Sequence, residues 1–231
     1  MKKIAALIFL AGFFIKGFAL IKVGVIAGTD IVSVPGKDLG ATDVDGIPFT
    51  SFKRDTIHGP FLVGLNGEIG VPFLFDIEFT ADYAQTSYIV SYDAVTTEVP
   101  FYKRETDTLP FKRAGIYVTL RKDLISFPPL VSLVHLHFGA GAQLALISPV
   151  VSEKFVSDLI TKKVNNFDLS TEVHVNAAPG IHLMLGTRIA PPLLPLSFSL
   201  NYRVAMYAPP VGKYDEPNII PSLYAGMSFG F

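Results

Sequence analysis

Three histidines and two carboxylates are the residues of this chain whose types and spacing could support chemistry. One residue separates His135 from His137, so both imidazoles lie on one face of an extended strand, and His182 is expected at similar height on the neighbouring strand. With Asp76 or Glu68 these side chains have the donor types of a metal shell. In a polar interior, however, a His-x-His pair more often belongs to a hydrogen-bond network. We therefore expect no metal and no cofactor.

These side chains must be positioned by strands, because apolar residues recur at every second position along most of the chain. The clearest segment is 74–83, where apolar residues alternate with Asp76, Glu78, Thr80 and Asp82. Segments of about ten residues have the length that a tilted strand needs to cross a bilayer. Eight such segments are predicted, at about 20–28, 61–70, 74–83, 114–121, 131–146, 171–187, 196–207 and 223–231.

The composition agrees with strands that cross a membrane. Half of the 231 residues are apolar and the mean hydropathy is +0.44. Beyond the N-terminal segment, however, no apolar stretch approaches the roughly 18 residues of a transmembrane helix. Apolar content spread as alternation is typical of a transmembrane β-barrel. The formal net charge of −1 gives no reason to expect nucleic acid as a partner.

The connections between the segments alternate in length, as short periplasmic turns and long outer loops do in such barrels. Residues 87–95 and 98–103 also have β character. They are interpreted as extensions of the third and fourth strands, and the alternative is one more hairpin that makes ten strands. Residues 152–163 have apolar side chains near helical spacing and predict a short helix. The short links are 71–72, 123–130 and 189–195, and the long links are 29–60, 84–113, 147–170 and 208–218.

Closure of the sheet determines which of its faces contacts lipid and which lines the lumen. Unpaired backbone groups are not tolerated in hydrocarbon, so a spanning sheet must close, with its apolar face outward. An eight-stranded barrel is narrow enough to be filled by side chains, so a packed polar core is expected in preference to a water-filled pore. A soluble lipocalin-like barrel is the structural alternative, but the Gly- and Ser-rich polar faces suit a crowded interior better. The expected inward set is Lys22, Glu68, Asp76, Glu78, Asp82, Arg121, His135, His137, His182, Arg188, Asn201 and Arg203.

The two ends of the chain carry export and assembly features. Residues 1–19 have two lysines, an apolar run and small residues in the layout of a secretory signal peptide, which leaves 20–231 as the barrel domain. The final segment resembles the C-terminal strand of bacterial outer-membrane β-barrels, in which a terminal Phe is the assembly signal. Its alternating apolar residues are Leu223, Ala225, Met227, Phe229 and Phe231.

Taken together, the pattern resembles the small eight-stranded outer-membrane barrels of the OmpA, OmpX and opacity-protein type. The resemblance implies an all-β, closed antiparallel transmembrane β-barrel in the bacterial outer membrane. It also implies outer-membrane lipids, lipopolysaccharide and the barrel-assembly machinery as partners, and a broad role in surface interaction, adhesion or envelope integrity. No catalytic residue follows from it.

Function is expected to depend on the outer loops 29–59 and 85–112, which would bind an extracellular ligand of unknown identity. The loops contain aromatic and basic residues of the kinds that anchor interfaces. The alternatives are a narrow channel and a lipid A-modifying enzyme, for which only His174, near Ser170 and Glu172, offers a catalytic candidate. The loop residues nominated as exposed anchors are Ile47, Phe49, Phe52, Tyr88, Tyr92, Phe101 and Tyr102, with Lys53, Arg54, Lys103 and Arg104 among them.

Overall fold

A computed structural model describes residues 21–71, 75–94, 103–127, 133–161, 174–191 and 194–230. The expected signal peptide, the terminal Phe231, and Ser170, Glu172, Phe101 and Tyr102 lie outside these residues. No helix within the described part of the chain is long and apolar enough to cross a membrane.

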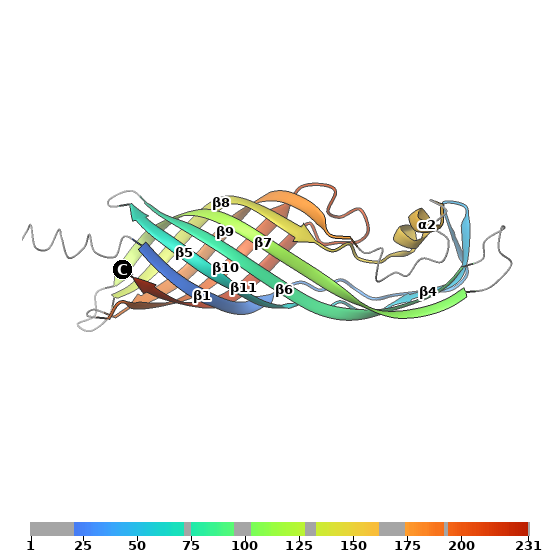
Figure 1. The fold of residues 1–231 in the computed structure, drawn as a ribbon, viewed down its shortest axis with the longest axis horizontal. Coiled ribbons are helices and arrows are strands. Elements are labelled where there is room, and N and C mark those ends of the chain that lie inside the picture. Colours follow the sequence, from blue (N-terminus) through green and yellow to red (C-terminus); the bar gives the residue numbers. More distant parts are fainter. Residues whose placement is uncertain are drawn as a thin grey trace, which may run out of the picture.

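Eight antiparallel strands form a closed ring, in which each ring strand pairs with the next ring strand along the chain and β11 pairs with β1 (Figure 1). The predicted all-β, eight-stranded closed barrel is therefore confirmed. The strands of the ring are β1 (Ile21–Asp30), β5 (Phe61–Val71), β6 (Phe75–Ala94), β7 (Lys103–Phe127), β8 (Leu133–Ile147), β9 (Asn176–Ala190), β10 (Leu196–Tyr207) and β11 (Ile219–Gly230).

Strands β6 and β7 extend far beyond the ring as one long hairpin (Figure 1). The predicted extension of these two strands is thus confirmed, and the ten-strand alternative is wrong. The predicted sixth strand begins later than expected, at Asn176, because its neighbour β8 ends at Ile147 and offers no further backbone partner.

The projecting hairpin carries additional structure from the first and third outer loops. Strand β4 (Ile47–Arg54) pairs with β6, and the short strands β2 (Lys37–Leu39) and β3 (Thr42–Val44) pair with β4. Helix α2 (Glu153–Thr161) contacts β3 and β4 and confirms the helix predicted in this link. Figure 1 shows this end of the molecule opposite the end that carries the C-terminus.

The ring has an apolar outside and a polar inside. Large apolar side chains on alternate positions of every ring strand are exposed, whereas the side chains between them are mostly buried in the lumen. Water would penalise so large an exposed apolar surface, while lipid would cover it. Exposed members include Val25, Leu65, Phe79, Ile116, Phe138, Leu183, Leu200 and Met227.

Candidate functional site

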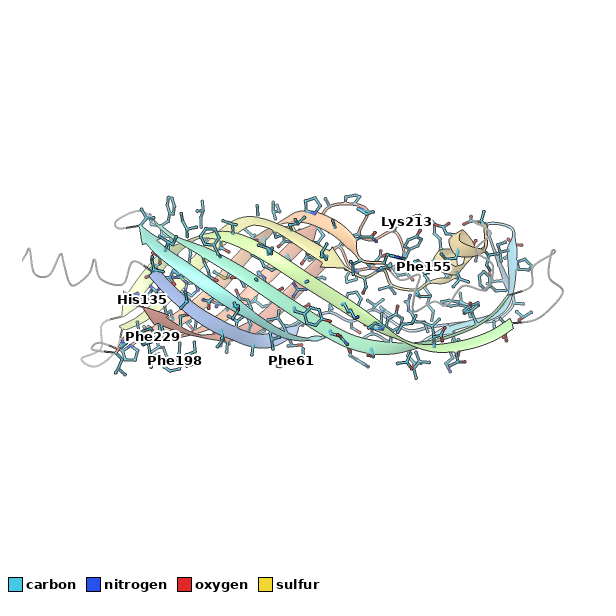
Figure 2. The ribbon with its side chains drawn as sticks, viewed as in Figure 1. Phe61, His135, Phe155, Phe198, Lys213 and Phe229 are labelled. Carbon is cyan, nitrogen blue, oxygen red and sulfur yellow. The ribbon has the colours of Figure 1, made fainter. Side chains whose placement is uncertain are left out.

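Paired charges occupy the end of the barrel that lies near the C-terminus, where Figure 2 labels His135. Glu68 is at the centre of this group. It contacts Lys22 (Nζ to Oε1, 2.7 Å), Arg188 (Nη1 to Oε1, 2.8 Å) and Arg121 (Nη2 to Oε2, 2.5 Å). We call this group the lower tier; its members are Lys22, Glu68, Asp76, Glu78, Arg121, Asp123, His135 and Arg188.

Arg121 joins β7 to its neighbour β6 within the lower tier. Its Nη1 donates to Glu78 Oε2 at 2.8 Å, and its Nη2 donates to Asp76 Oδ2 at 3.1 Å. Removing such charges from water is costly, and multiple close counter-charges offset that cost. This tier therefore brings into direct contact five residues that were nominated from the sequence for the lumen: Glu68, Asp76, Glu78, Arg121 and Arg188.

Asp123 is a member of the lower tier that the sequence interpretation placed in a turn. Its Oδ2 lies 3.0 Å from His135 Nδ1 and 3.3 Å from Arg188 Nη2. A bulge in β7 follows it, so that Leu124 and Ile125 both face outward although they are adjacent. Bulges re-aim side chains in this way. In the sequence, the only sign of this bulge is a break in the apolar–polar alternation after Asp123.

A second group of charges closes the opposite end of the lumen and is completely buried. Arg113 donates from Nε and Nη2 to the two oxygens of Asp30 at 2.8 and 2.9 Å, and from Nη1 to Asp82 Oδ1 at 2.7 Å. Arg203 pairs with the other oxygen of Asp82, and its guanidinium lies 3.5 Å from the ring centroid of Tyr117. We call Asp30, Asp82, Arg113, Tyr117 and Arg203 the upper tier.

Two residues of the upper tier were not expected in the lumen. The sequence interpretation assigned Asp30 and Arg113 to the outer links 29–60 and 84–113. The structure places their side chains inside the barrel, with no exposed surface. Asp82 and Arg203, which were nominated, are in this tier rather than with Asp76 and Glu78.

The three nominated histidines do not gather. His137 Nε2 lies 2.8 Å from Asn201 Oδ1, and His182 Nε2 lies 2.8 Å from Thr119 Oγ1. His137 is paired in register with Gly186, four positions along β9 from His182, so the expectation that these histidines share one height is wrong. Among the described residues, no three potential metal-ligating side chains are close enough to hold an ion.

The lumen between the two tiers is narrow, and glycines occupy the wall positions where no side chain would fit. A Cβ atom added to Gly186 would lie 2.1 Å from Asn201 Oδ1 and 2.7 Å from His137 Nε2. On Gly141 it would lie 1.9 Å from the carbonyl oxygen of Val118. Such distances leave no room for a side chain, so the wall carries glycine where groups of the neighbouring strands approach it most closely.

Beyond the upper tier, the outer loops pack around an apolar core. We call this part the outer lobe; it comprises residues 31–59, 85–94, 103–112, 148–161 and 208–218. Phe49, Phe52, Arg54, Tyr88 and Tyr92 are buried in it, so the expectation that they are exposed anchors is wrong. Other buried members of this core include Leu109, Phe111, Val150, Val151, Phe155, Val156 and Leu159.

A cluster of charges joins three loops of the outer lobe. Lys37 Nζ lies 2.9 Å from both Glu153 Oε1 and Asp215 Oδ2, and the buried Arg54 donates from Nη1 to Asp215 at 3.0 Å. Arg54 also donates to the carbonyl oxygens of Pro35 and Val151. We call Lys37, Arg54, Glu153 and Asp215 the clasp, because they connect the first, third and fourth outer loops.

The clasp changes the titration of its members. Burial alone would raise the pKa of Asp215, but hydrogen bonds from Lys37 and Arg54 lower it below its ordinary value. Burial would lower the pKa of Lys37, but the hydrogen bonds to Glu153 and Asp215 raise it. Both shifts favour the charged forms, so the clasp is an ion-paired contact over the neutral pH range.

Among the other nominated residues, Ile47 is partly buried against the core of the lobe, whereas His174 and the apolar residues of β11 lie on the surface. His174 is exposed and precedes β9, while its suggested partners Ser170 and Glu172 lie outside the described residues. On β11, Leu223, Ala225, Met227 and Phe229 all face outward. Figure 2 shows Phe198 and Phe229 at the same end of the barrel as His135, and Phe155 and Lys213 at the other end, near α2.

Comparisons with known proteins return fold-level likenesses. No protein-family model matches the chain, and no curated protein matches it. It is similar to the crystal structure of Neisserial surface protein A (NspA), with 16% identity and a TM-score of 0.44, over 91% of this chain and 97% of that one. It is also similar to Ail, the attachment invasion locus protein of Yersinia pestis, solved with the heparin analogue sucrose octasulfate; identity is 11% and the TM-score 0.34, over 91% and 96% of the two chains.

The class of the protein follows from its own geometry. A closed ring of eight antiparallel strands, an apolar outer surface and a charge-paired lumen define a small transmembrane β-barrel of the outer-membrane type. In this chain the outer lobe, a folded apolar core, lies on top of the barrel.

Proposed function

We propose that this chain is a non-enzymatic outer-membrane surface protein that displays a folded lobe on a closed barrel. Its role is in surface interaction, adhesion or envelope integrity, with an extracellular ligand that binds the outer lobe. The observation that carries the proposal is the shared core of the lobe, in which side chains from the first outer loop, the β6–β7 hairpin and α2 are buried together. A rigid scaffold that presents a folded surface is typical of binding proteins.

The two tiers favour a barrel that acts as a scaffold for the lobe and not as a channel for water or ions. Arg113, Asp30 and Asp82 are buried across the lumen at its outer end, and Arg121, Glu68 and Arg188 connect strands at the other. A narrow eight-stranded barrel with crossing ion pairs has little room for a water column. We therefore expect planar-bilayer recordings to show no stable large conductance, and a steady porin-like current would contradict this part of the proposal.

Buried aromatics change where the ligand should bind. Phe49, Phe52, Tyr88 and Tyr92 are unavailable as contacts, so we expect recognition to involve the side chains that the lobe exposes, most of which are polar. That surface includes Thr50 and Lys53 on β4 and Thr106 and Thr108 on β7, all of them exposed. A ligand of this surface would be bound through hydrogen bonds, as polar and well-hydrated interfaces are.

The test removes the outer lobe and keeps the barrel. Replacing 31–58, 86–111, 149–173 and 209–217 with short turns leaves Asp30 and Arg113 in place, and also removes α2, whose apolar face would otherwise lose its cover. The variant should insert and remain heat-modifiable. Binding of cells that express it to immobilised glycans and matrix proteins should be lost. Unchanged binding would contradict a role of the lobe in recognition.

Two further readouts separate the remaining roles. If the barrel acts in envelope integrity, permeability to large antibiotics should rise when the whole chain is deleted but not when only the lobe is removed. If the chain modifies lipid A, cells with and without it should differ in lipid A acylation, and the change should depend on His174. The proposal expects identical lipid A in both.

A further inference from the structure

Two lysines on β7 differ from the other cations of the barrel wall. Lys112 and Lys122 face outward, and within the described part of the chain their ammonium groups have no hydrogen-bond or ion-pair partner. Their sequence neighbours Arg113 and Arg121 face inward and belong to the upper and lower tiers. Alternation along one strand thus gives each tier an inward arginine and leaves an outward lysine beside it.

The spacing of the two lysines matches the thickness of the hydrocarbon layer. They are ten positions apart, and the outward residues between them are apolar: Ala114, Ile116, Val118 and Leu120. Ten residues of strand rise about 34 Å, which becomes roughly 24 Å when the strand is tilted by about 45°. The apolar band of such barrels is about 25 Å tall. The two ammonium groups therefore lie at the two edges of the apolar band.

Lys112 has a polar cross-strand neighbour, Gln85, whereas the cross-strand neighbour of Lys122 on β8 is aromatic. Gln85 is paired in register with Lys112 on one side and with Phe61, which is 64% exposed, on the other. Tyr83 donates its hydroxyl hydrogen to Gln85 Oε1 at 2.5 Å, so the amide N–H groups of Gln85 are left to donate elsewhere. Lys122 is paired in register with the exposed Phe138.

We propose that Lys112, with Gln85 and Tyr83, binds a phosphate group on the headgroup of an outer-leaflet glycolipid. Acyl chains that cover Ile116 and Val118 belong to lipids whose headgroups must lie directly above, at the height of Lys112. An ammonium that extends its apolar stem along the barrel and places its charge at the headgroup level is the expected behaviour of an interfacial lysine. Charge-assisted hydrogen bonds from Lys112 and the Gln85 amide suit phosphate oxygens.

This inference rests on the proposed function, because it requires the outer lobe to face the outside of the cell. The switch in the outward face of β6, from the apolar Phe79 and the amphipathic Tyr83 to Gln85 and Ser87, marks the same boundary. Phe61 and Tyr83 provide aromatic surface at the level where acyl chains meet headgroups, as in the aromatic girdles of barrels.

The test measures phosphate-dependent lipid binding by the folded full chain. Native mass spectrometry would count adducts of bisphosphorylated lipid A and of chemically dephosphorylated lipid A on the wild-type chain and on Lys112→Gln. Lys122→Gln is the matched control from the same strand, and Lys154→Gln on α2 is the control for loss of charge in the lobe. Heat-modifiable migration verifies that each variant is folded.

We expect the wild-type chain to retain the bisphosphorylated lipid preferentially, and Lys112→Gln to lower that preference roughly fivefold, the effect of a partly solvated ion pair. Both control variants should keep the preference. The proposal is overturned if Lys112→Gln binds like the wild type, if the wild type shows no preference, or if Lys122→Gln loses it equally. Failure of the proposed function would appear separately, as absence of the native chain from the outer-membrane fraction.

Discussion

The barrel and the outer lobe are built on opposite principles although two strands run through both. In the barrel the inward face is charged and the outward face is apolar, with Arg113 and Arg203 completely buried and Ile116 and Leu200 exposed. In the lobe the buried face is apolar, as in a water-soluble domain. The difference teaches that the surrounding medium, lipid or water, determines which face of one continuous strand is polar.

Strand β6 shows the change within a few residues. Its inward side chains change from Glu78 and Asp82 in the barrel to Tyr88 and Val90 in the lobe, all four of them buried. On β7 the same transition lies between the inward Phe111 and Arg113. Because strand pairing between β6 and β7 continues without a break, the two cores are held in fixed register.

Arg113→Met should cause the largest loss of stability, because Arg113 lies where the charged core of the barrel meets the apolar core of the lobe. The substitution leaves Asp30 without its bidentate partner and takes one of two guanidinium contacts from Asp82. Breaking a buried ion pair in this way costs about 3–5 kcal/mol. Urea unfolding in detergent, followed by heat-modifiable migration, should show a much lower midpoint.

Arg203→Met provides the comparison for that result. It also removes a partner of Asp82, but Asp82 would keep Arg113, and Asp30 would keep both of its contacts with Arg113. Its loss of stability should therefore be smaller than that of Arg113→Met. Equal losses would mean that the upper tier does not depend on Arg113 in particular.

Phe111→Ala should destabilise the lobe and leave the barrel folded. Phe111 is completely buried in the apolar core of the lobe, and truncation of a buried Phe costs about 3–5 kcal/mol. The penalty should fall on the lobe, so limited proteolysis should cleave the outer segments rapidly while the barrel core resists and remains heat-modifiable. Loss of barrel insertion would show that the two regions fold as one unit.

Much of the barrel could be predicted from the sequence, because a period of two is a direct consequence of strand geometry and one face was uniformly apolar. Glu68, Asp76 and Arg121 could be assigned to the lumen for that reason, and they are in contact there. Asp30 and Arg113 could not. Both lie where the polarity of the two faces reverses, and a pattern that requires one constant apolar face ends there.

For the outer lobe, secondary-structure elements could be predicted from the sequence, but their packing could not. The helix at 153–161 and the extended β6–β7 hairpin followed from local periodicity. The burial of Phe52 and Tyr88 did not, because whether an aromatic loop residue is an exposed anchor or a core member depends on contacts between distant loops. The clasp is a similar case: Lys37, Glu153 and Asp215 are far apart in the sequence and offer no local signal.

Gly186→Ala should have an intermediate effect and tests how tightly the lumen is filled. Its added methyl would lie 2.1 Å from Asn201 Oδ1, so the hydrogen bond that this oxygen accepts from His137 Nε2 must shift. Overpacking of this kind costs about 1–3 kcal/mol. Gly67→Ala on β5 is the matched control, because there the nearest atom would be 3.8 Å away, an ordinary contact. Similar unfolding midpoints for both variants would argue for a loosely filled lumen.

The smallest effect is expected from the clasp, which should make the lobe, and not the barrel, sensitive to acid. The lowered pKa of Asp215 means that its contribution to stability is complete above the ordinary aspartate pKa of about 4 and is lost as the pH falls through the lowered value. The raised pKa of Lys37 acts in the other direction, since its contribution is lost only as the pH rises through that raised value. The clasp should therefore be intact from about pH 5 to 9.

Asp215→Asn isolates this contribution. Because Asp215 is about one-third exposed, its loss should cost only about 1 kcal/mol, and less at high salt. At neutral pH the variant should show faster proteolysis of the lobe with an unchanged barrel, and the difference from the wild type should shrink as the pH falls below about 4. Asp38→Asn, at a largely exposed position 3.8 Å from Lys53, should change nothing. If Asp215→Asn and the wild type differ by the same amount at every pH, the residue acts through packing or hydrogen bonding, and the clasp is not an ionic contact.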